Sequence, residues 1–187
     1  YLTVKKLGDY KRLGTTIDDA LGEAFDKTAK LLNLGYPGGP KIEELARKGN
    51  KNRFVLPKPI FNRGGCNLSF AGLKTAILRV KEFIKTDKDK NDLAASFQKT
   101  VLDILYKKTK KAIEQHLELH PKNRTLVVAG GVAANKQIRI TLEKLCQEEK
   151  FNIYFPDLKL CTDNAAMIAL AGLERFKKKK FDNCLLY

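Results

Sequence analysis

The stretch Leu126-Val127-Val128-Ala129-Gly130-Gly131-Val132-Ala133-Ala134-Asn135 decides the fold class. Its first four apolar residues predict a buried strand, and the glycine pair predicts a turn that leads directly into a helix. A second short strand is expected at residues 151–155. A strand, a glycine turn, a helix and another strand in this order indicate an α/β layered fold.

The glycine turn has two interpretations. Without a Cβ at Gly130 and Gly131, a phosphate or a flat ligand can approach the backbone closely. The side chain of Asn135 offers both a donor and an acceptor for the edge of a base. The alternative is a tight strand-to-helix turn with no ligand.

Downstream, the stretch Leu160–Ile168 places Asp163 just before a helix expected from Asn164 to about Phe176. One interpretation makes Asp163 a helix cap together with Thr162, which stabilises a helix by roughly 1 kcal/mol. The other makes Asp163 a hard oxygen ligand for a metal or for a metal-bound phosphate. The pattern alone leaves both open.

Upstream, apolar residues at helical spacing predict a helix from Ile17 to Leu32 that Thr16 caps. Opposite its apolar face lies an acidic stripe of Asp19, Glu23 and Asp26. The stripe is either a solvated face or a set of acceptors for ribose hydroxyls beside the glycine loop that follows. The glycine inside this helix, Gly22, predicts close packing against its backbone, since glycine costs roughly 1 kcal/mol there.

The glycine loop Tyr36–Pro40 leads into a helix that starts at Pro40 and runs through Ile42, Leu45 and Ala46. Residues 47–69 read as irregular. Further helices are expected from about Leu73 to Ile84 and from Asp92 to the limit set by Pro121, with a charged surface loop at residues 85–91.

Composition limits the function classes. The 187 residues suit one domain, and 36 Lys and Arg against 21 Asp and Glu give a net charge of +15. This excess favours polyanions such as nucleic acids, although lysines spread over solvated surfaces would explain it as well. Without a CxxC pair, Cys66, Cys146, Cys161 and Cys184 read as reduced thiols. The longest nearly apolar stretch, Leu126–Ala134, is too short for a transmembrane helix. No signal peptide is expected, because no apolar core follows Tyr1 to Lys6.

The spacing of His116 and His120 permits a shared metal on one helix face. Leu117 stands where a metalloprotease motif has Glu, and Pro121 ends the helix at once. The pair therefore reads as two surface histidines. No nucleophile with a base and no complete zinc motif supports a protease.

Together, several stretches resemble one family, the bacterial-type tRNA N6-adenosine threonylcarbamoyltransferases (TsaD), formerly called glycoproteases. The matching segments cover nearly the whole chain: Gly8-Asp9-Tyr10, Leu13-Gly14, Asp18–Leu32, Tyr36–Pro40, Phe70–Ala76, Ala94–Gln98, Leu126–Asn135 and Cys161–Ala169. Ala71 departs from the Ser that the family usually has before Gly-Leu-Lys-Thr.

The resemblance implies an actin-like (ASKHA, ribonuclease H-like) fold, of which this chain would be the C-terminal portion with part of the other lobe missing. It divides the chain into a nucleotide-binding helix and glycine loop (1–50), a helical insertion (51–120) and a strand-Gly-Gly-helix with a metal-ligand segment (121–187). It implies an acyltransferase that moves threonylcarbamoyl from threonylcarbamoyl-AMP to N6 of adenosine 37, in tRNAs that read codons beginning with adenine.

The same resemblance assigns roles to individual residues. Asp26, Gly39, Glu43 and Asn135 match positions that bind the nucleotide, threonylcarbamoyl-AMP or ATP. Asp163 matches the carboxylate ligand of one divalent metal, iron or zinc, whose other ligands lie outside this chain. The implied partners are tRNA and TsaB-like and TsaE-like subunits, in the cytoplasm and without a membrane.

Family members carry an HxxxH metal pair and a Ser-Gly-Gly-His-Thr loop ahead of the region that starts at Tyr1. We therefore expect this chain to be incompetent in transfer by itself and prone to self-association. The alternative is a nucleotide-binding or subunit-interaction module without chemistry. A sugar or acyl kinase of the same superfamily is a third reading, against which the stretches Asp18–Lys27 and Cys161–Ile168 argue.

Overall fold

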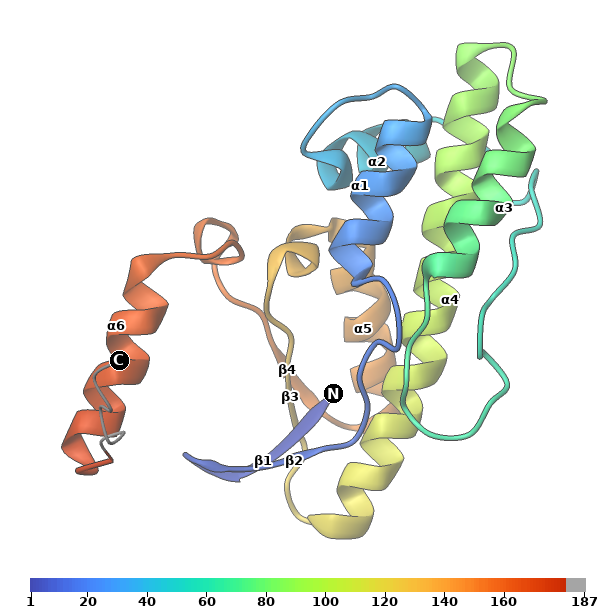
Figure 1. Ribbon diagram of the computed structural model, residues 1–187. Helices are drawn as coiled ribbons and strands as arrows, with labels where there is room; N and C mark the ends of the chain where they lie inside the picture. The colour runs from blue at the N-terminus through green and yellow to red at the C-terminus, as the bar shows by residue number, and fades with distance from the viewer. Residues whose placement is uncertain (181–187) are drawn as a thin grey trace.

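The computed structural model describes residues 1–180. Figure 1 shows a group of packed helices beside short strands, with α6 standing apart. The elements in chain order are β1 (Leu2–Lys6), β2 (Asp9–Arg12), α1 (Leu21–Leu31), α2 (Gly38–Ala46), α3 (Ala71–Lys81), α4 (Asp87–Leu119), β3 (Thr125–Val127), the 3-10 helix η1 (Gly131–Ala134), α5 (Lys136–Glu149), β4 (Asn152–Tyr154), the 3-10 helix η2 (Leu158–Leu160) and α6 (Ala165–Lys177). The α/β class is confirmed.

The core lies around α4, the longest helix with 33 residues. Helices α1, α2, α3 and α5 surround it, and we call these five helices the helical body (Figure 1). Phe25 of α1 and Phe97 of α4 meet edge to face, with ring centroids 5.1 Å apart. Because both rings are buried, this contact joins two helices that are far apart in the sequence.

The first helix begins later than the pattern predicts, and its expected cap is wrong. Thr15 and Ile17 exchange backbone hydrogen bonds with Leu68, so this segment is extended. The carboxylate of Asp18 instead accepts the hydroxyl of Ser69 and the backbone N–H groups at the start of α3, so it caps a different helix. Burial alone would raise the pKa of Asp18, but these hydrogen bonds lower it.

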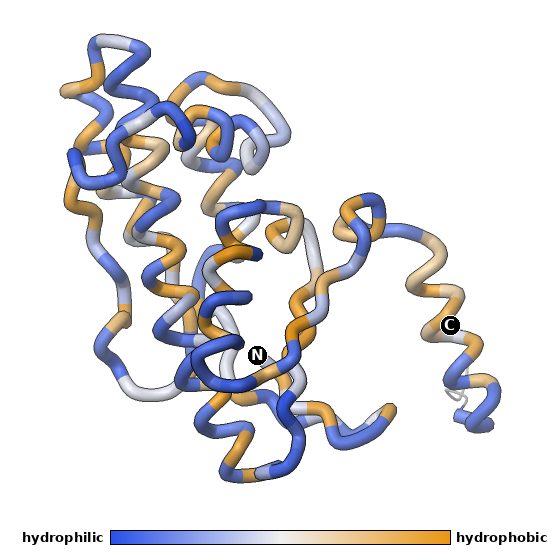
Figure 2. The backbone as a smooth tube through the Cα atoms, turned by 180° about the vertical axis from the view of Figure 1, so that it is seen from behind, coloured by the Kyte–Doolittle hydropathy of each residue, from blue (hydrophilic) through white to orange (hydrophobic). Residues whose placement is uncertain are grey.

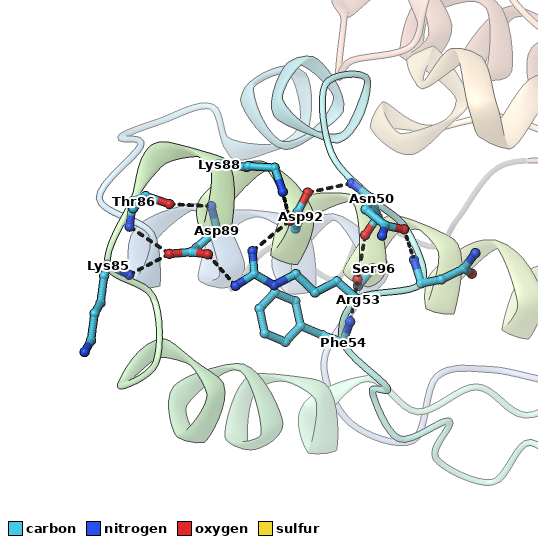
Figure 3. Close-up of polar contacts among 10 residues, drawn as sticks. Asn50, Arg53, Phe54, Lys85, Thr86, Lys88, Asp89, Asp92 and Ser96 are labelled. Carbon is cyan, nitrogen blue, oxygen red and sulfur yellow. Dashed lines mark hydrogen bonds and ion pairs between the residues drawn. The ribbon is translucent and has the colours of Figure 1, made fainter.

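The segment expected to be a surface loop at residues 85–91 is mostly helix, and α4 begins at Asp87. Thr86 and Asp89 form a reciprocal capping box that starts the helix five residues early. Figure 3 shows that Arg53, from the irregular segment, reaches both Asp89 (2.5 Å) and Asp92 (2.9 Å). The charged stretch at the start of α4 is therefore held in place by Arg53, which lies more than thirty residues earlier in the chain.

The strands form two separate sheets of two strands each. Strands β1 and β2 are antiparallel, and β3 and β4 are parallel, with Leu126 opposite Ile153. The prediction of a buried strand at 126–129 is wrong in this structure, because Val127 is 66% exposed. Apolar strand residues are buried only where a neighbour covers them, and no described residue covers this one.

A groove of about 580 Å³ lies between the two sheets. Its walls include Leu2, Thr3 and Val4 of β1 on one side and all of β3 on the other, and Ile113 of α4 lies beneath. Neither β2 nor β4 lines it. The unpaired edges of β1 and β3 therefore face the same groove.

Helix α6 stands apart from the helical body (Figures 1 and 2). None of its residues is buried. Its N-cap is Asn164, whose side chain accepts the backbone N–H of Met167 at 3.0 Å. The expected caps Thr162 and Asp163 are wrong, since the helix begins one residue too late for them. No helix among residues 1–180 is both long and apolar enough to cross a membrane.

Cys66, Cys146 and Cys161 are buried free thiols, as expected, and Cys184 lies outside the described residues.

Candidate nucleotide site

The nucleotide-binding residues implied by the resemblance lie on α1, on α2 and at the start of α5. Asp26 and Glu43 each accept a backbone N–H group near the start of a neighbouring helix, α2 and α5 respectively. Asn135 caps α5 itself. We call Asp26, Gly39, Glu43 and Asn135, with the backbone that they hold, the polar junction.

Asp26 fixes the glycine loop. Its Oδ1 accepts the N–H of Gly38 at 2.8 Å. A Cβ at Gly38 would lie only 2.7 Å from the Ala29 side chain and the Asp26 backbone, so no other residue fits there. At Gly39 a Cβ would meet nothing within 4 Å. One side of the loop is thus packed, and the other is open to a ligand.

The other two acidic residues of the stripe, Asp19 and Glu23, share one lysine partner. Lys27 Nζ lies 2.6 Å from Asp19 and 2.8 Å from Glu23, and these hydrogen bonds raise the pKa of Lys27. This part of the stripe agrees with the solvated-face interpretation. The close packing expected at Gly22 is wrong, because an added Cβ would have only an ordinary contact with Val132 at 3.9 Å.

Glu43 ties α2 to α5. Its buried carboxylate accepts the backbone N–H of Lys136 at 3.0 Å, and Arg47 lies 3.6 Å away. A carboxylate at a helix start satisfies free N–H groups and interacts favourably with the helix dipole. Glu43 therefore fixes where α5 starts relative to the glycine loop.

Asn135 uses both the oxygen and the nitrogen of its side-chain amide within the fold. Its Oδ1 accepts the N–H of Ile138, and its Nδ2 donates to Gln98 Oε1, each at 3.0 Å. The surface beside it is the backbone of Gly130 and Gly131, where an added Cβ would meet nothing within 4 Å. Gln98 had no assigned role in the sequence analysis, because only the fold reveals that it holds Asn135.

The junction leaves two open glycine backbones, at the start of α2 and just before α5. The N–H groups of Gly38, Lys136 and Ile138 are already accepted by side chains, so a phosphate would approach the backbone of the open glycines instead. Asp26 and Glu43 hold these helix starts without any ligand. This arrangement can bind an anionic nucleotide against preformed backbone.

Asp163 lies on the exposed turn that precedes α6. Helix α6 itself stands apart from the helical body (Figure 1). Arg139 links this region to η1, because it donates to the carbonyls of Ala133 (2.5 Å) and Pro156 (3.0 Å). Among residues 1–180, no three His, Cys, Asp or Glu side chains are grouped so that they could hold a metal.

His116 has partners at both ring nitrogens, which agrees with the surface interpretation of the histidine pair. Nδ1 contacts the hydroxyl of Thr3, and Nε2 lies 3.0 Å from the carbonyl of Asn123. The ring packs beside His120, with centroids 5.3 Å apart. His116 therefore joins β1 to the end of α4.

The chain is similar to one family of known proteins over nearly its whole length. The family model described as tRNA N6-adenosine threonylcarbamoyltransferase matches residues 1–170. Curated relatives bearing that name are 63% identical over 97% of this chain in Pelagibacter ubique, 49% over 100% in Roseobacter denitrificans and 54% over 92% in Brucella suis. These matches cover 51%, 53% and 49% of the relatives, so the chain spans about half their length.

Proposed function

The chain belongs to the tRNA N6-adenosine threonylcarbamoyltransferase family, and we propose that it supplies the nucleotide-binding part of that activity. In this proposal, threonylcarbamoyl passes from threonylcarbamoyl-AMP to N6 of adenosine 37, in tRNAs that read codons beginning with adenine. The amine forms the new bond to the carbamoyl carbon and loses a proton, and AMP leaves. The observation that carries the proposal is the polar junction.

Each residue of the junction has a separate task in this proposal. Asp26 holds the loop so that the open side of Gly39 faces the ligand. Glu43 and Asn135 hold the start of α5, and the backbone at Gly130 and Gly131 accepts the close approach of phosphate or sugar. Preformed N–H donors do not need to reorganise when the leaving AMP gains charge.

The described residues do not form a metal site, since they offer no group of three ligands. We propose that Asp163, which is exposed, gives a single ligand to a divalent iron or zinc ion held mainly by residues outside this set. Such an ion would act as a Lewis acid when bound. Metal binding that persists unchanged in Asp163→Ala, in an assembly that contains the other ligands, would contradict this role.

We propose that the two sheets are parts of one actin-like sheet. A strand between β1 and β3 would pair with both free edges, and their shared groove is the observation that supports it. Residues 1–180 contain no strand in that place. According to the same proposal, the 187-residue chain alone does not transfer threonylcarbamoyl to tRNA. Mass spectrometry of the tRNA nucleosides should then detect no modified adenosine. Modified adenosine formed by the purified chain alone would contradict it.

The remaining assignments rest on the family. We propose that the chain acts on tRNA in the cytoplasm, together with TsaB-like and TsaE-like subunits. Its net charge of +15 supports a polyanionic partner.

The nucleotide site is tested by adding a methyl group where the fold leaves room. Gly39→Ala and Gly131→Ala each place a Cβ in open space, so folding should be unaffected. Gly172→Ala in α6 is the matched control, because its Cβ would also meet nothing within 4 Å. Calorimetric titration with ATP should show weaker binding to the first two variants and wild-type binding to the control. Equal binding by all four proteins would contradict the proposed site.

A further inference from the structure

The loop Phe61–Gly65 lies against the middle of α4 and forms a second pocket of about 270 Å³. This pocket belongs to the segment 51–120, which the polar junction uses only through Gln98. Gln98 precedes Lys107 by nine residues, or about 14 Å along a helix. The pocket is therefore a separate place on the same helix.

The loop is held in shape without a ligand. The side chain of Lys108 is buried (2% exposed), and its Nζ donates to the carbonyls of Arg63 (2.7 Å) and Gly65 (3.3 Å). Lys107 Nζ donates to Asn62 Oδ1 at 2.7 Å and lies 4.2 Å from the centroid of the Phe61 ring. These contacts from α4 fix the loop on both sides, so the pocket is preformed.

The charge of the pocket is strongly positive. Five cations line it (Arg63, Lys107, Lys108, Lys110 and Lys111) against one carboxylate, Glu114. Glu114 is paired with Lys111 at 2.8 Å, and Lys110 is paired with Glu149 at 2.7 Å. Lys107 has neutral partners, and within residues 1–180 Arg63 forms no ion pair with a carboxylate. Two exposed cations thus remain to bind an anion.

The loop backbone is open beside these two cations. A Cβ at Gly64 or Gly65 would meet nothing within 4 Å. Gly65 has a φ of +79°, which favours glycine, whereas Gly64 has no such requirement. Open backbone next to a lysine and an arginine suits a phosphodiester, since phosphate contacts in nucleic-acid complexes come from these groups. Phe61 is already covered by Lys107, so base stacking is not part of the site.

We propose that the pocket formed by Arg63, Gly64 and Lys107 binds phosphate groups of an RNA backbone. That this RNA is tRNA rests on the proposed function. The site would position RNA irrespective of sequence, and base recognition would come from elsewhere.

The test compares two double variants that remove the same charge from the whole chain. Arg63→Ala with Lys107→Ala changes the pocket, and Arg79→Ala with Lys74→Ala removes an exposed arginine and lysine from α3. Binding of unmodified tRNA transcript is measured by fluorescence anisotropy at several salt concentrations. Loss of two phosphate contacts should weaken binding and reduce the slope of log K against log salt by about 1.4 to 1.8. The α3 variant should retain the wild-type slope.

Gly64→Ala provides a test without a change of charge. The added methyl has room in the folded chain, so a purely structural loop predicts unchanged RNA binding, whereas a phosphate site predicts weaker binding. Equal losses in the two double variants, together with no effect of Gly64→Ala, would overturn the inference. ATP titration of the same proteins separates the two proposals, because the pocket variants should keep ATP binding. Wild-type chain that binds no ATP would contradict the polar junction without affecting the RNA result.

Discussion

The helical body and the remainder of the chain differ in how their apolar residues are used. In the body, residues such as Phe25, Phe97 and Leu93 are almost completely buried. In β1–β4 and α6, which we call the open side, Val127 and Leu170 are 66% and 61% exposed. The body is therefore stabilised by its own contacts, whereas the open side presents apolar surface and strand edges that no other strand within residues 1–180 pairs with, among them those of β1 and β3.

The largest expected difference in stability is between Leu-to-Ala substitutions made in each of the two regions. Leu93→Ala removes a side chain with 0% exposure from α4 and should lower the free energy of unfolding by about 2–5 kcal/mol. Leu170→Ala on α6 should change it by less than about 0.5 kcal/mol. Urea unfolding followed by circular dichroism measures both. Similar losses at the two positions would contradict the division into body and open side.

Within the body, the next largest effect concerns the cluster in Figure 3. Asp92 accepts the N–H of Asn50 at 2.6 Å and pairs with Arg53 at 2.9 Å. Asp92→Asn should cost about 1–3 kcal/mol, because it leaves buried donors poorly matched. Asp87→Asn, at an exposed position of the same helix, should cost less than about 1 kcal/mol. Thermal unfolding of both variants distinguishes a fixed cluster from a loose one.

The same cluster predicts the response to acid. The hydrogen bond from the Asn50 backbone and that from Arg53 lower the pKa of Asp92, and backbone bonds from Lys85 and Thr86 lower that of Asp89. The two carboxylates contribute fully to the stability of the fold above the ordinary Asp pKa of about 4, and this contribution is lost as the pH falls below that value. The melting temperature should therefore decrease as the pH is lowered beyond about 4. This decrease should be less steep in Asp92→Asn than in the wild type. Parallel pH profiles for variant and wild type would refute this cause.

The smallest expected effect on stability is at the open side. Free strand edges favour pairing between chains, so the purified chain should self-associate as its concentration rises. Val127→Lys should reduce this association without changing unfolding. Leu78→Lys, at a 52% exposed position of α3, adds the same charge to the helical body and should leave the self-association unchanged. Light scattering at micromolar concentration tests this, and a wild-type chain that is a clean monomer would contradict it.

Local patterns predicted the helices well and their ends poorly. Helical spacing identified α1, and a helix was also expected where α6 lies, but Thr16 and Asp163 are not their caps. The start of α1 is set by pairing with Leu68, which lies about fifty residues away and has no local signal. The start of α4 did have one, because Thr86 and Asp89 stand three residues apart as in a capping box.

The candidate site shows a similar limit. The residue pattern singled out Asp26 and Asn135, and the family resemblance added Glu43, but no spacing indicates that Asp26 and Glu43 hold the starts of two neighbouring helices. The roles of Gln98 and Arg139 are set by hydrogen bonds to Asn135 and Pro156, which lie 37 and 17 residues away in the sequence. Burial of the strand at 126–129 failed as a prediction for the same reason, since a strand is buried only by its neighbours.

The most direct test of the polar junction is hydrogen–deuterium exchange of the chain with and without ATP. Amides at residues 36–39 and 130–136 should exchange more slowly when ATP is present. Those of α6 should be unchanged and fast, and those in the middle of α4 slow in both states. Protection that appears only on the open side, or none at residues 36–39 and 130–136 under saturating ATP, would contradict the nucleotide site in the helical body.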